Sequence, residues 1–175
     1  MDDTNIYLIG FMGCGKSFVS APLAARLGFS RLETDGETEK REGKTITEMF
    51  EKYGEEYFRD AETRVVLGAA KLRRTVVSCG GGAALRRGNA DAMKSSGTVV
   101  LLTAAPETVL ARVAGGGDRP LLAGNADVGY IRKKMEERKA AYEYAADFAV
   151  ATDGKSAEEI CAEIIAGRNA LCRKR

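Results

Sequence analysis

The chain has 175 residues with a formal net charge of +2, and 45% of its residues are hydrophobic. This length suits a single domain with a substantial core, and the small net charge gives no reason to expect nucleic acid or an acidic membrane as a partner. The sequence contains no histidine, which excludes Ser-His and Cys-His catalysis and leaves acid–base chemistry to Asp, Glu, Lys, Tyr or Cys.

The first 28 residues follow a strand, loop and helix pattern. Asn5–Ile9 is a short apolar run that predicts a buried strand, and the segment FVSAPLAARLG after Ser17 predicts a helix that ends at Gly28. Between them, residues 10–17 read GFMGCGKS and fit G-x-x-x-x-G-K-[ST], the phosphate-binding loop of nucleotide-binding proteins. The alternative is a glycine-rich turn that happens to hold Lys-Ser, and the flanking strand and helix disfavour it.

This loop predicts binding of ATP or GTP together with Mg²⁺. Its curled backbone can direct several N–H groups at one anion, and the helix N-terminus adds partial positive charge. Lys16 can reach the outer phosphates, and the Ser17 hydroxyl can ligate the metal. The residues expected to contact the nucleotide here are Gly13, Cys14, Gly15, Lys16, Ser17 and Phe18.

Five apolar runs separated by helical patterns indicate an α/β fold with a parallel sheet wrapped by helices. The predicted strands are 5–9, 31–34, 75–78, 98–103 and 148–151. Ligands of such sheets bind at the carboxyl ends of the strands. We therefore expect the chemistry just after each strand.

Two carboxylates, Glu33 and Asp35, follow the second strand in the segment LETDGETEK. At this spacing both can face one cleft, where one would hold Mg²⁺ through water and the other would take the proton of a substrate hydroxyl. The alternative is a surface turn before a charged helix, with Asp35 as its cap. The glycine loop across the cleft favours the functional interpretation.

Residues 45–53 and 54–73 are predicted as two helices. Apolar residues recur at helical spacing in the second and predict a buried stripe of Phe58, Ala61, Val65, Ala69 and Leu72. Arg59 lies one position off this stripe, so the pattern alone predicts a solvated side chain.

The third strand runs into Cys79 and three consecutive glycines at 80–82. Such glycines permit unusual backbone dihedrals and let a ligand lie against bare backbone. A flexible turn is the alternative. The carboxylate that often follows an apolar strand to hold Mg²⁺ is missing here, which assigns metal binding to Glu33 and Asp35.

Residues 85–96 and 106–115 are predicted as helices that flank the fourth strand. The glycine-rich segment at about 115–125 then predicts a mobile lid, from which Arg119 would stabilise charge on the transferred phosphate. An exposed loop with one arginine is the alternative. Arg112, on the preceding helix, is a candidate for stacking on adenine.

The helix predicted at 127–146 places Arg138 on the same face as Tyr142. A guanidinium on a core-facing stripe is costly unless an anion meets it, so this pattern favours an arginine aimed into the cleft. Lys155 follows the last strand, where many such folds hold the base, and 156–171 is predicted as a structural helix.

The remaining features concern compartment and assembly. The four cysteines show no C-x-x-C spacing, which indicates reduced thiols. No run approaches the ~20 apolar residues of a membrane span, and the start MDDTNIYLIG is unlike a signal peptide. We expect a cytoplasmic monomer that acts on small molecules.

The ordered motifs GFMGCGKS, TD, GKTITEMFEKYGEEYFRDAE, CGGGAA, DRPLLAG and ERKAAY closely resemble shikimate kinase. The resemblance covers nearly the whole chain, and the FR-x-x-E block and the triple glycine are its most specific parts. It implies ATP-dependent phosphorylation of the 3-hydroxyl group of shikimate, in aromatic amino-acid biosynthesis. It also implies one P-loop kinase domain over 1–175, similar to nucleoside monophosphate kinases. In such a domain a five-stranded parallel sheet carries helices on both faces, with a substrate-binding helical segment at about 35–62 and a mobile lid at about 115–125.

The resemblance implies a role for each matching residue at the substrate. Asp35 matches the aspartate that contacts the reacting hydroxyl and is the candidate base. Arg59 and Arg138 match the pair that grips the shikimate carboxylate, where two guanidinium forks would fix one planar anion. The backbone along the substrate matches Gly80, Gly81 and Gly82, with Gly81 the expected direct contact.

At the phosphates, Lys16 and Arg119 match the phosphate lysine and the lid arginine, and Ser17 matches the Mg²⁺ ligand. Two positions depart from the family pattern. Glu33 stands where aspartate is usual, and its extra methylene is expected to shift the metal-bridging water. Cys14 stands where alanine is common, which suggests sensitivity to thiol reagents.

Three other functions fit parts of the sequence. A gluconate kinase also needs a carboxylate clamp, but the triple glycine and the FR-x-x-E block favour shikimate. A GTP switch protein needs an N-K-x-D motif, which is absent. A kinase-like binding module without activity is disfavoured because the lysine, the aspartate and the three arginines are all present.

Overall fold

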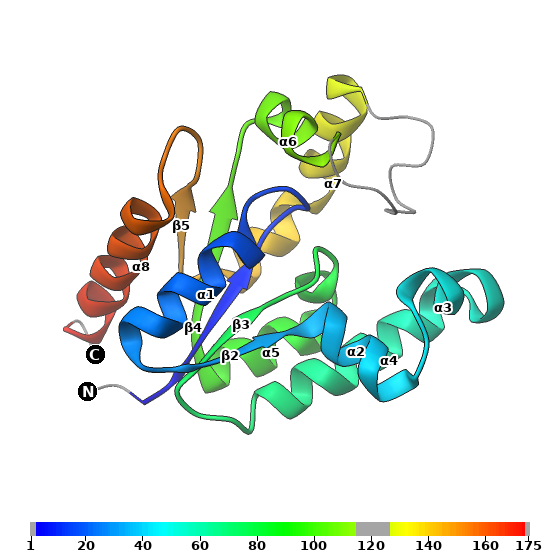
Figure 1. Cartoon of the computed structure of the whole chain (residues 1–175), viewed down its shortest axis with the longest axis horizontal. Helices are drawn as coiled ribbons and strands as arrows, with labels where there is room; N and C mark the ends of the chain where they lie inside the picture. The colour runs from blue at the N-terminus through cyan, green and yellow to red at the C-terminus, as the bar shows by residue number, and fades with distance from the viewer. Residues whose placement is uncertain (1–2, 115–126, 174–175) are drawn as a thin grey trace.

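A five-stranded parallel sheet forms the centre of the molecule (Figure 1). The computed structural model describes residues 3–114 and 127–173. Its strands lie in the order β2-β3-β1-β4-β5, and their bounds are β1 (Asn5–Ile9), β2 (Ser30–Glu33), β3 (Thr75–Ser78), β4 (Gly97–Thr103) and β5 (Phe148–Ala151). The predicted five parallel strands are confirmed, with shifts of one residue at both ends of β2 and at the start of β4.

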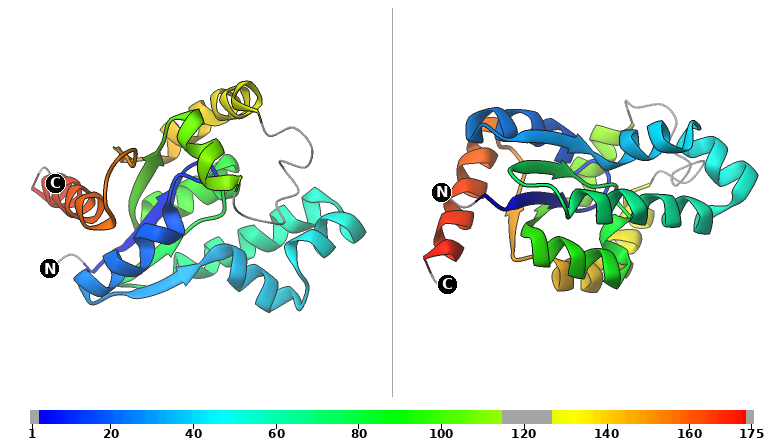
Figure 2. Two further views of the ribbon diagram at one scale, coloured as in Figure 1. Left: turned by 45° about the horizontal axis from the view of Figure 1, so that its top comes forward. Right: turned by 90° about the horizontal axis from the view of Figure 1, so that it is seen from below.

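Helices cover both faces of the sheet, as predicted. On one face α1 (Lys16–Leu27) packs beside α8 (Ala157–Cys172), and on the other α5 (Arg87–Ser96) packs beside α7 (Val128–Ala145) (Figure 2). All five residues of β1 are buried, because this strand is paired on both edges and covered on both faces.

Three helices form a segment that extends away from the sheet beside β2 (Figure 1). They are α2 (Thr34–Glu42), α3 (Ile46–Tyr53) and α4 (Glu55–Ala69). The start of α3 is fixed by a capping box, in which Thr45 accepts a hydrogen bond from the Glu48 backbone and the Glu48 carboxylate accepts one from the Thr45 backbone.

Two predicted details of the helices are wrong. α4 ends at Ala69 rather than at residue 73, so Leu72 lies beyond it and is 41% exposed, although the other four residues of the predicted stripe are buried. α5 begins at Arg87, after a short 3₁₀ turn η1 (Ala83–Leu85). The remaining helix, α6 (Pro106–Val113), starts with proline at its first position, as the sequence predicts.

The strand register brings the expected chemistry to one edge of the sheet. Ser78 at the end of β3 pairs with Leu8 on one side and with Glu33 on the other. The phosphate loop leaves β1 at the same edge. The predicted lid and Arg119 lie outside the described residues. Within the described parts of the chain, no helix combines the length and apolarity that a membrane crossing needs.

Candidate active site

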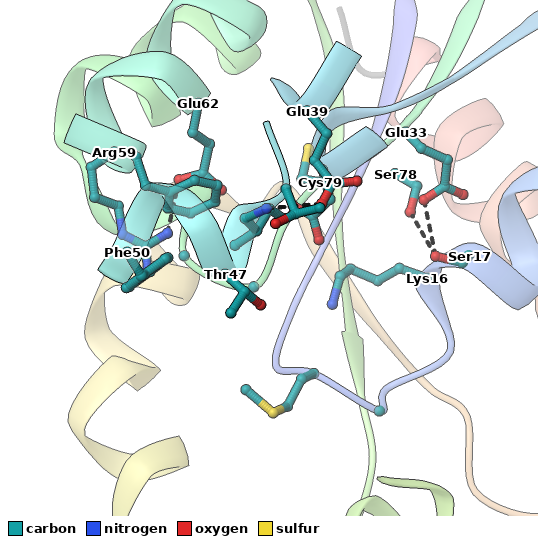
Figure 3. A pocket seen from close by; sticks show the side chains of 18 of the residues that line it. Lys16, Ser17, Glu33, Glu39, Thr47, Phe50, Arg59, Glu62, Ser78 and Cys79 are labelled. Carbon is teal, nitrogen blue, oxygen red and sulfur yellow. Dashed lines mark hydrogen bonds and ion pairs between the residues drawn. The ribbon is translucent and has the colours of Figure 1, made fainter. Parts of the chain in front are cut away.

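A cavity of about 780 Å³ opens at the carboxyl edge of the sheet. In Figure 3, Ser17, Glu33 and Ser78 lie at one end, Arg59, Glu62 and Phe50 lie at the other, and Lys16 lies between them. The walls come from the phosphate loop, the start of α1, the β2–α2 junction, α3, α4, the loop after β3, Arg112 of α6 and Arg138 of α7. The cavity therefore collects side chains from segments spread over most of the chain.

The phosphate loop forms one wall. Gly13 and Gly15 adopt φ values of 75° and 93°, which L side chains rarely reach, so the loop can curl toward the start of α1. No side chain caps that helix N-terminus, and its N–H groups remain available to an anion. Lys16 Nζ donates to the carbonyl oxygens of Gly10 and Phe11 at 2.8 and 2.9 Å, which holds the ammonium group over the loop.

Cys14, also in this loop, is turned away from the cavity. Its side chain is 1% exposed, and burial raises the pKa of the thiol. A buried thiol with a raised pKa is a poor nucleophile. The structure therefore argues against the expected sensitivity of this position to thiol reagents.

Oxygen atoms gather around Ser17. Its Oγ donates to Glu33 Oε2 at 3.0 Å and lies 3.5 Å from Ser78 Oγ (Figure 3). Ser78 was not predicted as a site residue, and its signal was only its place at a strand end. Hydroxyl and carboxylate oxygens are ligands that suit Mg²⁺.

Asp35 lines the cavity from the first turn of α2. Desolvation raises the pKa of its carboxyl group, Lys16 opposes this rise, and Glu33 adds to it. A carboxylate with a raised pKa accepts a proton more readily than an ordinary aspartate does.

Glycine is required after β3 for a different reason from the one predicted. The residues with positive φ do not include them, so the expectation of unusual dihedrals is wrong. A Cβ on Gly80 would lie 2.4 Å from Asp35 Oδ1 and 2.6 Å from Glu62 Oε1, and a Cβ on Gly82 would lie 2.0 Å from Arg59 Nη1. These glycines admit charged side chains. Gly81 and Gly82 line the cavity, whereas Gly80 is set behind it.

Arg59 is buried, at 9% exposure, so the solvated side chain predicted from the helix pattern is wrong. Its Nη1 donates to Glu62 Oε2 at 2.9 Å, and its Nη2 and Nε donate to Glu55 Oε1. Glu62 is 1% exposed, and its Oε1 has no hydrogen-bond partner. Desolvation raises the pKa of Glu62, and Arg59 opposes this.

Glu62 was not predicted as a site residue, although it is the last residue of the FR-x-x-E block. The available signal was its spacing from Arg59, because residues three apart on a helix are neighbours. The ion pair with Glu62 therefore holds the guanidinium of Arg59 at the cavity wall.

Arg138 lines the cavity from α7, the direction that its helix face predicted. Its Nη1 lies 3.4 Å from the Gly81 carbonyl oxygen, and its guanidinium lies 5.3 Å from the centre of the Phe11 ring. Tyr142, one turn later, donates to the same Gly81 oxygen at 2.6 Å, and burial raises the pKa of this tyrosine to about 12. α7 is thus tied directly to the glycine loop.

A second hollow of about 400 Å³ adjoins the cavity, and Gly15, Phe18 and Arg112 border both. Lys155 lines this hollow and pairs with Glu163 at 2.7 Å. Arg112 donates to Gly13 O at 3.1 Å and to Thr152 Oγ1 and O at 3.0 and 3.2 Å. The residues predicted to hold the nucleotide base therefore meet beside the phosphate loop.

The chain is similar to known proteins along most of its length. A family model described as "Shikimate kinase" matches residues 12–167. Shikimate kinase from Persephonella marina is 44% identical over 92% of this chain and 96% of the relative, and that from Caldanaerobacter subterraneus subsp. tengcongensis is 40% identical over 92% and 94%.

Solved structures give the same result. Shikimate kinase from Acinetobacter baumannii in complex with shikimate is 34% identical, with a TM-score of 0.90 over 98% of this chain and 94% of that one. The enzyme from Aquifex aeolicus is 36% identical, with a TM-score of 0.83 over 96% and 98%. A gluconokinase from Sinorhizobium meliloti, at 20% identity and a TM-score of 0.58, shares the fold alone.

Proposed function

The chain belongs to the shikimate kinase family, and we propose that it transfers the γ-phosphate of ATP to the 3-hydroxyl group of shikimate, in aromatic amino-acid biosynthesis. The products are ADP and shikimate 3-phosphate. One observation carries the proposal: a single cavity is lined by the phosphate loop, by two arginines, Arg59 and Arg138, and by the carboxylate of Asp35.

ATP binds with its phosphates on the loop after β1. The backbone N–H groups of Gly13, Cys14 and Gly15 and the N-terminus of α1 meet the phosphate oxygens. Lys16, held over the loop by two carbonyl oxygens, moves onto the outer phosphates. The base occupies the adjoining hollow lined by Phe18, Arg112 and Lys155, where the Arg112 guanidinium offers a flat face for stacking.

Ser17 and Glu33 fit a magnesium ion bound together with the nucleotide. Among the described residues no group of three acidic or cysteine side chains could hold a metal alone, which suits an ion that takes most of its ligands from phosphates and water. Ser17 contributes its hydroxyl directly, and Glu33 acts through a bridging water. When bound, the ion offsets negative charge on the phosphate oxygens.

Shikimate occupies the end of the cavity beside α4 and α7. Arg59 and Arg138 bind its carboxylate, and the backbone of Gly81 and Gly82 forms the wall along its ring, with Gly81 in contact. Both guanidinium groups are fixed, one by Glu55 and Glu62 and the other near the Gly81 carbonyl. Fixed donors orient a planar anion at little entropic cost.

Asp35 acts as the base. The 3-hydroxyl oxygen attacks the γ-phosphorus, the hydroxyl proton passes to the Asp35 carboxylate, and the bond between the γ-phosphorus and the bridging oxygen breaks to release ADP. Lys16 stabilises the charge that develops on the phosphate oxygens. Arg119, from the predicted lid, is assigned to the same charge on the family pattern alone.

The test is ADP release measured with shikimate, gluconate and quinate side by side. We expect turnover with shikimate well above that with the other two acids, and a product that carries phosphate on the 3-oxygen. Gluconate turnover equal to or above that with shikimate would assign the chain to another sugar-acid kinase. Uptake of phosphate on a different oxygen would contradict the placement of Asp35.

We also propose that the protein works in the cytoplasm as a monomer, with no nucleic-acid or membrane partner. Cys14, Cys79 and Cys161 are buried free thiols, as is usual in a reducing compartment. Sedimentation of the active protein tests the oligomeric state, and a sedimenting dimer would contradict this part of the proposal.

A further inference from the structure

Glu33 is held from two sides, and only one side faces the phosphate loop. Its Oε2 accepts from Ser17 Oγ at 3.0 Å. Its other oxygen, Oε1, accepts from Ser20 Oγ at 3.1 Å and forms an ion pair with Arg31 Nη2. Arg31 Nε also donates to Ser20 Oγ at 2.8 Å, so these two residues and Glu33 form a closed triangle.

The triangle follows from the local fold. Arg31 and Glu33 are two apart on β2, where alternate side chains share a face of the sheet. Ser20 lies on α1 one turn after Ser17 and is fully buried, and its single hydroxyl proton is shared between Glu33 Oε1 and the Ser17 carbonyl oxygen, each 3.1 Å away. The serine is therefore fixed by the helix that begins at the phosphate loop, and Arg31 reaches it from the strand.

A glutamate at this place needs such support more than an aspartate does. It has one more rotatable bond, and its side chain is 32% exposed, so an unsupported carboxylate would occupy several rotamers. The contacts at Oε1 fix the group and turn Oε2 toward Ser17 (Figure 3). Ligand-orienting partners of this kind raise the affinity of metal sites.

We propose that Arg31 and Ser20 are positioning residues that hold Oε2 of Glu33 toward Ser17, where it serves the hydrated Mg²⁺ of the bound nucleotide. The inference rests on the proposed function, because that function assigns Glu33 to the metal. It accounts for a glutamate at this position, because the contacts of Ser20 and Arg31 with Oε1 restrain the longer side chain.

Because Arg31 is charged, the direction in which its removal changes Mg²⁺ binding tests the proposal. A guanidinium close to a cation site weakens cation binding by repulsion. If Arg31 acted only through its charge, its removal would tighten Mg²⁺ binding. If it acts by positioning Glu33, its removal weakens Mg²⁺ binding.

The experiment measures ADP affinity by calorimetry over a series of Mg²⁺ concentrations, so its readout does not depend on turnover. In Arg31→Ala we expect the Mg²⁺ concentration for half-maximal enhancement of ADP binding to rise about ten-fold. ADP affinity in EDTA should stay unchanged. Ser20→Ala, which alters no charge, should shift the Mg²⁺ requirement in the same direction. The matched control is Arg26→Ala, which removes an equal charge from the exposed last turn of α1 and should cause no shift.

A double-mutant cycle with Glu33→Gln assigns the effect to the carboxylate. In the Glu33→Gln background, Arg31→Ala should cause little further change. An Arg31→Ala protein with an unchanged or lower Mg²⁺ requirement would overturn the proposal, as would an equal shift in the Glu33→Gln background. If Ser20→Ala does not fold, the part-exposed Arg31 still decides the result. A wild-type protein without shikimate-dependent ADP release would instead contradict the proposed function.

Discussion

Asp35 is the residue on which the proposed chemistry depends most directly. Its carboxylate lies beside Gly80 and lines the same cavity as the phosphate loop and the two arginines. In Asp35→Asn the amide cannot accept the hydroxyl proton, so turnover should fall by about 10²-fold or more. ADP affinity should change little, because the carboxylate serves the acceptor. Steady-state kinetics and calorimetry check the two parts, with the exposed Asp91→Asn as the control.

The pH dependence of the wild-type enzyme gives a second readout of this prediction. Asp35 works in its charged form, so kcat/KM falls as the pH drops through its pKa. Because desolvation raises that pKa, the acid limb should lie above the value of about 3.9 for an ordinary aspartate. Near-normal turnover of Asp35→Asn, with the acid limb retained, would remove Asp35 from the mechanism.

The cysteines differ sharply in exposure, although the sequence shows four similar thiols. Cys14, Cys79 and Cys161 are buried, whereas Cys172 is exposed, and burial raises the pKa of each of the three buried thiols. A thiol-specific reagent should label one equivalent quickly, and the other three only as the chain unfolds. In Cys172→Ser the fast phase should disappear. A fast phase that remained and abolished ADP binding would mean that Cys14 is accessible.

At the scale of elements, α4 carries a buried ion pair that serves the site. In Arg59→Ala the carboxylate of Glu62, which is 1% exposed, would lose the cation that donates to it, so the free energy of unfolding should fall by about 3 kcal/mol. Adding Glu62→Gln removes the stranded charge and should recover most of this loss. Urea unfolding at neutral pH measures both variants.

Arg64→Ala is the matched control for the α4 pair. It removes an arginine from the same helix, but its ion pair with Glu42 involves a guanidinium that is 56% exposed, and exposed pairs contribute less than about 1 kcal/mol. Equal losses of unfolding free energy in Arg59→Ala and Arg64→Ala, or no recovery in the double variant, would contradict this prediction. Either result would mean that the buried Glu62 carboxylate does not destabilise the fold when Arg59 is absent.

The tie between α7 and the glycine loop gives another prediction. Tyr142→Phe removes the donor to the Gly81 carbonyl and frees the loop beside Arg138. One hydrogen bond contributes about 1 kcal/mol, so KM for shikimate should rise about five-fold while ADP affinity and kcat change little. Tyr144→Phe is the control, because its hydroxyl bonds Asp91 at the surface. A fall in kcat with KM unchanged would contradict a positioning role.

At the scale of the whole molecule, the three inner strands β1, β3 and β4 were predictable because burial on both faces of a parallel sheet selects apolar runs. From the residue pattern α2 was predicted only as the charged helix of the alternative interpretation, since its sequence TDGETEKRE has no apolar stripe. Its buried positions are threonines, and Thr38 donates to the Thr34 carbonyl while Thr34 accepts from the Gly80 backbone. Contacts of this kind leave no periodic signal.

The site residues likewise divide into those that the sequence predicts and those that it does not. Lys16 and Ser17 were predictable from one contiguous motif, and the aim of Arg138 from its helix face. The burial of Arg59 was not, because it depends on Glu62 and on the space left by Gly82. Those three residues come from two segments about 20 positions apart, and only the tertiary fold brings them together. The contacts of Ser20 and Arg31 with Glu33 could not be predicted from the sequence for the same reason.

The arrangement of the cavity predicts that its two ends fail independently. Lys16 comes from the phosphate loop and Arg138 from α7, and the two contact different parts of Phe11: Lys16 donates to its carbonyl oxygen, and the Arg138 guanidinium lies 5.3 Å from the centre of its ring. Each makes charge-assisted hydrogen bonds worth about 1.5–3 kcal/mol. Lys16→Ala should therefore weaken ADP binding about ten-fold or more and leave shikimate binding nearly intact, and Arg138→Ala should do the reverse. Calorimetry with each ligand alone measures both affinities. Lys139→Ala, next to Arg138 but exposed, should change neither. Equal losses of both ligands in either variant would mean that the substitution disturbs the whole fold, and that the two ends of the cavity are not separate binding sites.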